Sequence, residues 1–146
     1  MPDIDKIRDR FYSDRFASEA AGCAIQLAEP GHAVCTMELR RIHLNSNSVP
    51  MGGAIFTLAD FAFAVASNAY SEQVTVTQQV SVNFLSAAKG SMLIAEARCI
   101  RQGRSSCFYT VELRDELGTQ ADLQAVEAGL ACGVVFVASV HCDTLE

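Results

Sequence analysis

Residues 43–68, HLNSNSVPMGGAIFTLADFAFAVASN, decide how this chain folds. The stretch begins with polar, turn-forming residues, passes through the pair Gly52-Gly53, and then becomes apolar. Across residues 54–66 almost every side chain is Ala, Ile, Phe, Leu or Val. A helix that is apolar on all sides is buried. The stretch therefore predicts a loop followed by a long central helix that the rest of the chain covers.

One carboxylate, Asp60, interrupts this apolar run. An ionised Asp in a protein core is unfavourable unless it is paired, hydrogen-bonded or neutralised. At helical spacing it lies on the one polar stripe of the helix, with Gly53, Thr57, Ala64 and Ser67. Asp60 is therefore either a core acid that Thr57, a backbone group or a water satisfies, or a functional acid.

The glycine pair stands at the predicted start of the helix. Glycines allow a ligand to approach the backbone closely, and the first N–H groups of a helix have no partner within it. The helix dipole makes this end mildly positive. Gly52 and Gly53 could therefore hold an anion or a developing oxyanion.

The same stretch resembles the hotdog-fold acyl-CoA thioesterases of the phenylacetic-acid-degradation type, whose pattern is roughly H-x-N-x-x-x-x-x-H-G-G-x-x-F-x-L-A-D. The positions that match are His43, Asn45, Gly52, Gly53, Phe56, Leu58, Ala59 and Asp60. Met51 stands where the family usually has histidine, and a weaker likeness extends to about Asp115. The resemblance implies an α+β hotdog fold, in which a curved antiparallel sheet wraps around one long central helix.

Length and composition predict a single globular domain over residues 1–146. Half of the residues are hydrophobic and 19% are charged, which is typical of a folded domain. The net charge of −6 argues against nucleic acid or an anionic membrane as a general partner. A CoA ester is also an anion, so such a substrate would require a local basic patch.

The cysteines predict a reducing, cytoplasmic location. None of the six has CxxC or metal-ligand spacing, so we expect reduced, structural thiols and no metal site. The charged segment 3–15 predicts no signal peptide, and the apolar run 129–140 is too short to cross a bilayer.

Apolar and polar residues alternate over most of the remaining chain, which predicts strands. The predicted strands are residues 20–28, 33–40, 74–84, 92–100, 106–114 and 130–140, and residues 3–16 fit a short amphipathic helix. In the strand 74–84 the valines and Phe84 should face the helix, with Gln78 interrupting the set. Residues 120–129 have a helical composition where the family runs straight into its last strand, and their conformation stays open.

Two arginines, Arg101 and Arg104, lie at the predicted tip of the hairpin between residues 92–100 and 106–114. Arginine suits bidentate recognition of phosphate. With Lys89 they make the best basic patch along the sequence, and the resemblance implies that such loops contact the nucleotide end of CoA. A solvated turn is the alternative.

The resemblance also implies how the site works. A homodimer, or a tetramer of two dimers, places the helix start of one subunit opposite the carboxylate of the other. The N–H groups of Gly52 and Gly53 would hold the thioester oxygen while Asp60 acts as general base or as nucleophile. Asn45 would orient the water molecule or the thioester carbonyl.

Supporting contacts are expected from Thr77, at a position where the family often has Ser or Thr, and from His43 and Met51 beside the substrate. The expected activity is hydrolysis of an aryl or medium-chain acyl-CoA, with no cofactor beyond the CoA of the substrate. Because a thioether cannot replace the family's histidine as a proton donor, a non-catalytic acyl-CoA-binding protein is one alternative. A hotdog hydratase or dehydratase is the other.

Overall fold

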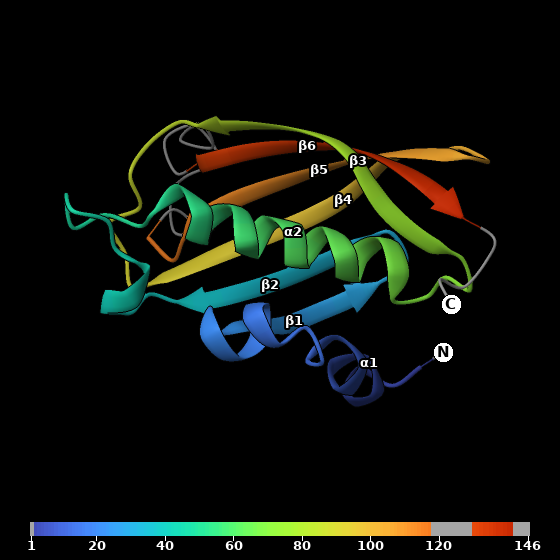
Figure 1. The fold of residues 1–146 in the computed structure, drawn as a ribbon, viewed down its shortest axis with the longest axis horizontal. Coiled ribbons are helices and arrows are strands. Elements are labelled where there is room, and N and C mark those ends of the chain that lie inside the picture. The colour runs from blue at the N-terminus through green and yellow to red at the C-terminus, as the bar shows by residue number, and fades with distance from the viewer. Residues whose placement is uncertain (1, 118–129, 142–146) are drawn as a thin grey trace.

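The computed structural model describes residues 2–117 and 130–141 (Figure 1). Its helical elements are α1 (Ile4–Phe11), the π-helical turn η1 (Phe16–Ala20), the 3-10 turn η2 (Arg41–His43) and α2 (Gly52–Asn68). Its strands are β1 (Cys23–Glu29), β2 (His32–Glu38), β3 (Val74–Phe84), β4 (Met92–Gln102), β5 (Ser106–Asp115) and β6 (Leu130–His141). The predicted segment 120–129 lies outside the described residues.

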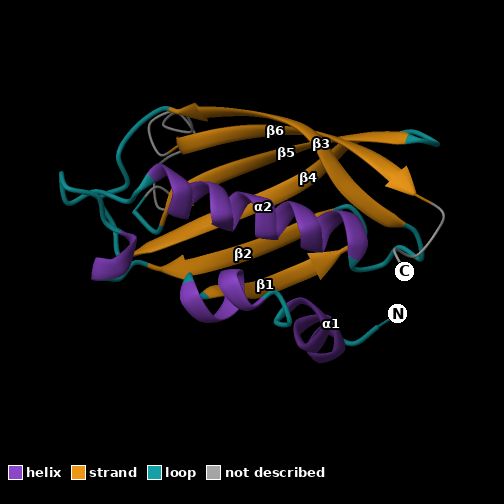
Figure 2. Cartoon of the chain, viewed as in Figure 1, coloured by secondary structure: helices purple, strands orange, loops and turns teal. Residues whose placement is uncertain are grey.

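The strands form one antiparallel sheet in the order β1-β2-β4-β5-β6-β3. The sheet curves around α2, which lies along its concave face (Figures 1 and 2). The predicted hotdog architecture and the central helix are therefore confirmed. The first two strands form the predicted hairpin, and Gly31 in its turn has a φ of 70°, which glycine adopts without strain.

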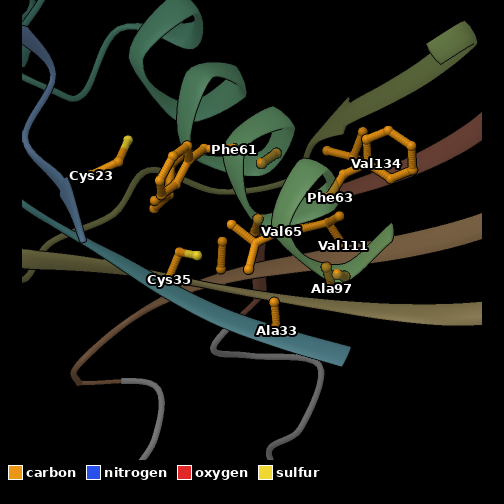
Figure 3. Close-up of a cluster of buried hydrophobic side chains, with 14 of the residues drawn as sticks. Cys23, Ala33, Cys35, Phe61, Phe63, Val65, Ala97, Val111 and Val134 are labelled. Carbon is orange, nitrogen blue, oxygen red and sulfur yellow. The ribbon is translucent and has the colours of Figure 1, made fainter. Parts of the chain in front are cut away.

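Small side chains on the middle strands let the helix approach the sheet. On β2 and β4, Ala33 pairs with Ala97 and Cys35 pairs with Ala95, and all four are fully buried. Larger apolar side chains of α2 fill the space on either side (Figure 3). The Phe63 ring stacks on Phe136 of β6 with centroids 4.4 Å apart. Complementary sizes of this kind give a close-packed core.

A bulge at Gln78 divides β3 into two parts that present different residues to the helix. Thr77 pairs with Ala138 and Gln79 with Val137, so Gln78 has no partner of its own. A bulge adds one residue and reverses the facing of those that follow. Val80 therefore shares the concave side with Phe136. Val74 and Val76 lie on the opposite side, so the prediction that all the valines face the helix was wrong.

The N-terminal segment covers the edge of the sheet near β1 (Figure 1). The apolar face of α1 buries Ile7 and Phe11, and the Arg8 guanidinium donates to the Ile25 carbonyl at 2.9 Å. The expected single helix over residues 3–16 ends early, at Phe11, and η1 follows it. This break places residues 14–17 beside α2.

Candidate active site

The helix start carries two free backbone donors. Met51 precedes the helix in an extended conformation, and its N–H donates to the His43 carbonyl at 2.8 Å. The Met51 carbonyl accepts the N–H groups of Ala54 and Ile55. Within residues 2–117 and 130–141, no acceptor contacts the N–H of Gly52 or Gly53. These two donors are therefore available to an anion or to a carbonyl oxygen.

The two glycines have different surroundings. A Cβ on Gly52 would lie 3.1 Å from Cζ of Phe84, so the absence of a side chain lets this ring cover the first turn. A Cβ on Gly53 would meet only the Met51 methyl group, at 3.8 Å. Gly53 is exposed, as is Met51. Gly52 therefore serves the packing of Phe84, whereas Gly53 leaves the helix start open.

Asp60 is exposed in the single chain, so the expectation of a buried acid was wrong. The concave sheet covers only one side of α2, and Asp60 lies on the other side with the intermediate residues Thr57 and Ala64. The hydroxyl of Thr57 donates to the Gly53 carbonyl at 2.8 Å. The polar stripe predicted from the sequence is thus the uncovered face of the helix.

The carboxylate of Asp60 faces a hollow of about 390 Å³. Phe56 and Phe61 of α2 and Phe16 of η1 form apolar parts of its wall, and Asp14 lines it as well. Partial removal of water raises the pKa of Asp60, and the nearby charge of Asp14 raises it further. Solvent still reaches the group, so Asp60 can meet a ligand and is poised to accept a proton.

Asn45 holds its own loop. Its Oδ1 accepts the N–H groups of Asn47, at 2.8 Å, and Val49, at 3.3 Å. An isolated bridge between Leu44 and Pro50 closes the same loop. The amide oxygen is therefore committed to the turn, and only the amide nitrogen is left to contact a substrate.

His43 has a structural role within this chain, and its expected contact with substrate remains a prediction. The ring is buried, with 4% of its surface exposed. Its Nδ1 accepts the Arg40 N–H at 2.9 Å, which makes Nε2 the protonated nitrogen, and Nε2 donates to the Ala21 carbonyl at 2.7 Å. Both nitrogens are thus used to join the loop before α2 to the end of η1.

Thr77 lies immediately before the bulge, on the helix-facing side of β3. It is exposed, and β3 is an edge strand whose outer backbone groups have no neighbouring strand among the described residues. A second chain that paired with this edge would bring its own groups next to Thr77.

The expected basic patch divides into two separate regions. Lys89 precedes the first residue of β4, whereas Arg101 lies at its other end and Arg104 just beyond. The 11 residues of β4 span roughly 36 Å. Lys89 instead lines a hollow with Arg40 and Arg41, two residues that no sequence motif marks. Arg40 and Arg41 come from another strand connection, so only the fold brings them to Lys89.

Asp60 lies eight residues after Gly52 on the same helix, which corresponds to about 12 Å along the axis. One chain therefore separates its acid from its free N–H groups by more than the size of a thioester group.

The described residues contain no group of three or more side chains that could hold a metal ion. Five cysteines in this part of the chain are free. No described helix is long and apolar enough to cross a membrane.

Comparisons with known proteins identify the family of this chain. The thioesterase superfamily model matches residues 48–121. A putative esterase of Archaeoglobus fulgidus is 32% identical over 113 residues, which are 77% of this chain and 73% of that protein. The acyl-coenzyme A thioesterase PaaI of Escherichia coli is 32% identical over 103 residues, which are 70% of this chain and 73% of PaaI.

A solved structure of a hypothetical thioesterase from Streptococcus pneumoniae with coenzyme A is also similar. It has a TM-score of 0.70 at 25% identity, and the match covers 91% of this chain and 95% of that one. The curved antiparallel sheet wrapped around one helix, together with these matches, defines the class of the hotdog-fold thioesterases. This chain belongs to the thioesterase superfamily and, within it, to the PaaI type.

Proposed function

We propose that the protein hydrolyses acyl-CoA thioesters and that Asp60 carries the reaction. The observation that carries this proposal is the accessible Asp60 carboxylate in a hollow walled by Phe16, Phe56 and Phe61. An acid beside apolar walls suits an acyl group on one side and the reacting carbonyl on the other. The printed name of the E. coli relative and the CoA in the S. pneumoniae structure support CoA as the leaving group.

The active form is a homodimer, or a tetramer of two dimers. In one chain Asp60 and the free N–H groups of Gly52 and Gly53 are too far apart for one carbonyl. The open edge of β3 offers backbone groups to a second copy. Pairing at this edge puts the helix start of one subunit near Asp60 of the other and encloses Thr77.

The reaction requires hydrogen-bond donors that bind the thioester carbonyl oxygen, and it requires an activated nucleophile. The N–H groups of Gly52 and Gly53 bind the carbonyl oxygen, whose negative charge grows as the tetrahedral intermediate forms. As general base, Asp60 takes a proton from water, the resulting hydroxide attacks the carbonyl, and the C–S bond then breaks. As nucleophile, it forms a mixed anhydride that water hydrolyses. In both routes the CoA sulfur leaves as thiolate and takes up a proton.

Met51 stands beside this site without replacing the family's histidine. Its side chain is 56% exposed and offers only a weakly accepting sulfur. The backbone donors and Asp60 do not depend on this side chain. We therefore expect activity to be retained, with a preference for aryl or medium-chain acyl groups that differs from that of the histidine-bearing relatives. A cytoplasmic location fits the free cysteines.

The deciding experiment measures thiol release from a panel of acyl-CoAs by the wild type and by Asp60→Asn. Loss of turnover in the variant, with acyl-CoA binding retained, supports the proposal. Tight binding without turnover by the wild type indicates a non-catalytic acyl-CoA-binding protein instead. Addition of water to an enoyl-CoA indicates a hydratase. Single-turnover hydrolysis in heavy-oxygen water distinguishes the two roles of Asp60, because only the nucleophilic route labels its carboxylate.

A further inference from the structure

A second hollow, of about 530 Å³, lies beside the loop that leads into α2. Three basic residues line it: Arg40, Arg41 and Lys89. They come from two connections, since Arg40 and Arg41 follow β2 while Lys89 lies between β3 and β4. Among the described residues, no acidic side chain is part of its wall. The wall of this hollow is therefore basic, although the chain as a whole has a net charge of −6.

Two of these cations are free to bind a ligand. The Arg40 guanidinium donates to the Ala20 carbonyl at 3.0 Å and so supports the fold. Among the residues that the structure describes, neither Arg41 nor Lys89 forms a side-chain hydrogen bond or an ion pair. Both side chains are exposed. Free cations that face one concave surface are typical of a site for phosphate groups.

The loop that carries Lys89 is held firmly. Oδ2 of Asp115 accepts the N–H groups of Lys89, at 2.8 Å, and Gly90, at 3.0 Å. The Glu116 carboxylate accepts the N–H groups of Ser91 and Met92. Both acids contact the loop from the end of β5 and neither lines the hollow. Binding at Lys89 therefore does not require this backbone to become ordered, which lowers the entropy lost.

The basic hollow is next to the proposed oxyanion site. It shares Val49, Pro50 and Ala88 with a hollow of about 420 Å³ that reaches Gly52 and Phe84. The Met51 N–H donates to the His43 carbonyl, and Arg41 lies only two residues before His43, a span of at most about 7 Å. A ligand with its carbonyl at the helix start and a long flexible arm can thus place an anionic end beside Arg41 and Lys89.

We infer that Arg41 and Lys89 bind the phosphate groups of the CoA nucleotide while its pantetheine arm crosses Val49, Pro50 and Ala88. This inference rests on the proposed hydrolysis of acyl-CoA. It identifies the nucleotide as the part of the substrate that the protein binds at a distance from the thioester bond. It also assigns no such role to the hairpin tip with Arg101 and Arg104, which lies at the other end of β4.

The test compares two thioesters of one acyl group, one of CoA and one of N-acetylcysteamine, which lacks the nucleotide. The variant is Arg41→Gln with Lys89→Gln, and the matched control is Arg101→Gln with Arg104→Gln, which removes the same charge. For the first pair we expect KM for the acyl-CoA to rise about tenfold or more, since contacts to charged groups reach this size. We expect kcat to stay within about twofold, because the reacting groups are untouched. Kinetics on the N-acetylcysteamine thioester should not change.

An unchanged KM, or an equal rise in both double variants, would overturn the inference. Calorimetric titration with CoA, dephospho-CoA and pantetheine separates it from the proposed hydrolysis. Weaker binding of CoA to the Arg41/Lys89 variant, with pantetheine unaffected, supports the phosphate site even if neither thioester is hydrolysed. Equal loss of affinity for pantetheine would contradict it. Dephospho-CoA shows whether the 3′-phosphate or the diphosphate makes the contact.

Discussion

Asp14 and Asp60 line the same hollow from two different elements, and the charge of Asp14 raises the pKa of Asp60. Asp14 belongs to the connection between α1 and η1, whereas Asp60 is on the uncovered face of α2. The N-terminal segment thus contributes to the electrostatics of the proposed active site as well as covering a sheet edge. A carboxyl whose pKa is raised holds its proton more tightly and is a stronger base once ionised.

Asp14→Asn should therefore lower the pKa of Asp60. The ionised base then persists to lower pH, so the acid limb of the profile of kcat/KM against pH should move to lower pH, as expected when a nearby like charge is removed. Asp9→Asn is the control, because it makes the same charge change on α1 without lining the hollow. An acid limb that does not move, or that moves equally in Asp9→Asn, contradicts a specific effect of Asp14 on Asp60.

Phe16 should determine which acyl groups are accepted. The ring is 71% exposed and lines the hollow beside Asp60. Phe16→Ala should leave Tm nearly unchanged, because little buried area is lost, and should lower kcat/KM for aryl and medium-chain acyl-CoAs several-fold more than for acetyl-CoA. The measurement is a substrate panel with both proteins. A loss that is equal for every acyl length would rule out a role in selection.

Gly53→Ala should separate stability from activity. The added methyl group meets only the Met51 side chain, at 3.8 Å, and alanine favours a helix over glycine by up to about 1 kcal/mol. The free energy of unfolding should therefore stay equal or rise. Thiol release should fall tenfold or more if the thioester carbonyl binds against this backbone. Gly52→Ala provides the contrast, because its methyl group would lie 3.1 Å from Cζ of Phe84 and should displace this 57% exposed ring as well.

His43→Ala should destabilise the protein without altering the chemistry. The change leaves the Arg40 N–H and the Ala21 carbonyl without partners, and each such buried group costs about 1–3 kcal/mol. Denaturant unfolding should show this loss, while kcat of the folded enzyme at low temperature stays near the wild-type value. His32→Ala is the control, because within the described structure the polar contacts of its ring go to the side chains of Glu29 and Glu96, so its loss leaves no backbone group there unpaired. A variant that is as stable as wild type but has a strongly reduced kcat would show that His43 has a direct role in the reaction.

Glu116 should make stability depend on pH in the acid range. Hydrogen bonds from the backbone of Ser91, of Glu116 itself and of Met92, and from the Ser91 hydroxyl, lower its pKa from 4.5 to about 2. A carboxyl whose pKa is lower in the folded state stabilises fully above its unfolded pKa and loses this effect as pH falls through the folded value. Glu116→Gln should thus be less stable than wild type near neutral pH, and the difference should vanish towards pH 2. Urea unfolding over this range is the measurement, with Glu72→Gln, at an exposed turn, as control.

Local patterns were sufficient to predict most of the fold. The period-two alternation located the strands, and the apolar run after Gly52-Gly53 located α2, because both signals come from neighbouring residues. The same patterns could not show the bulge at Gln78. The even-numbered valines of β3 fit a regular strand, and only pairing with β6 reveals the extra residue.

The sequence by itself determined the family, the central helix and the presence of an acid and two glycines upon it, since all of these lie within one short continuous stretch. Only the tertiary structure decided that Asp60 is open to solvent, that both nitrogens of His43 are occupied, and that Lys89 lies with Arg41 rather than with Arg101. The physical reason is that exposure and neighbourhood depend on how a curved sheet covers one side of a helix. That geometry arises from strand pairings between residues far apart in the chain.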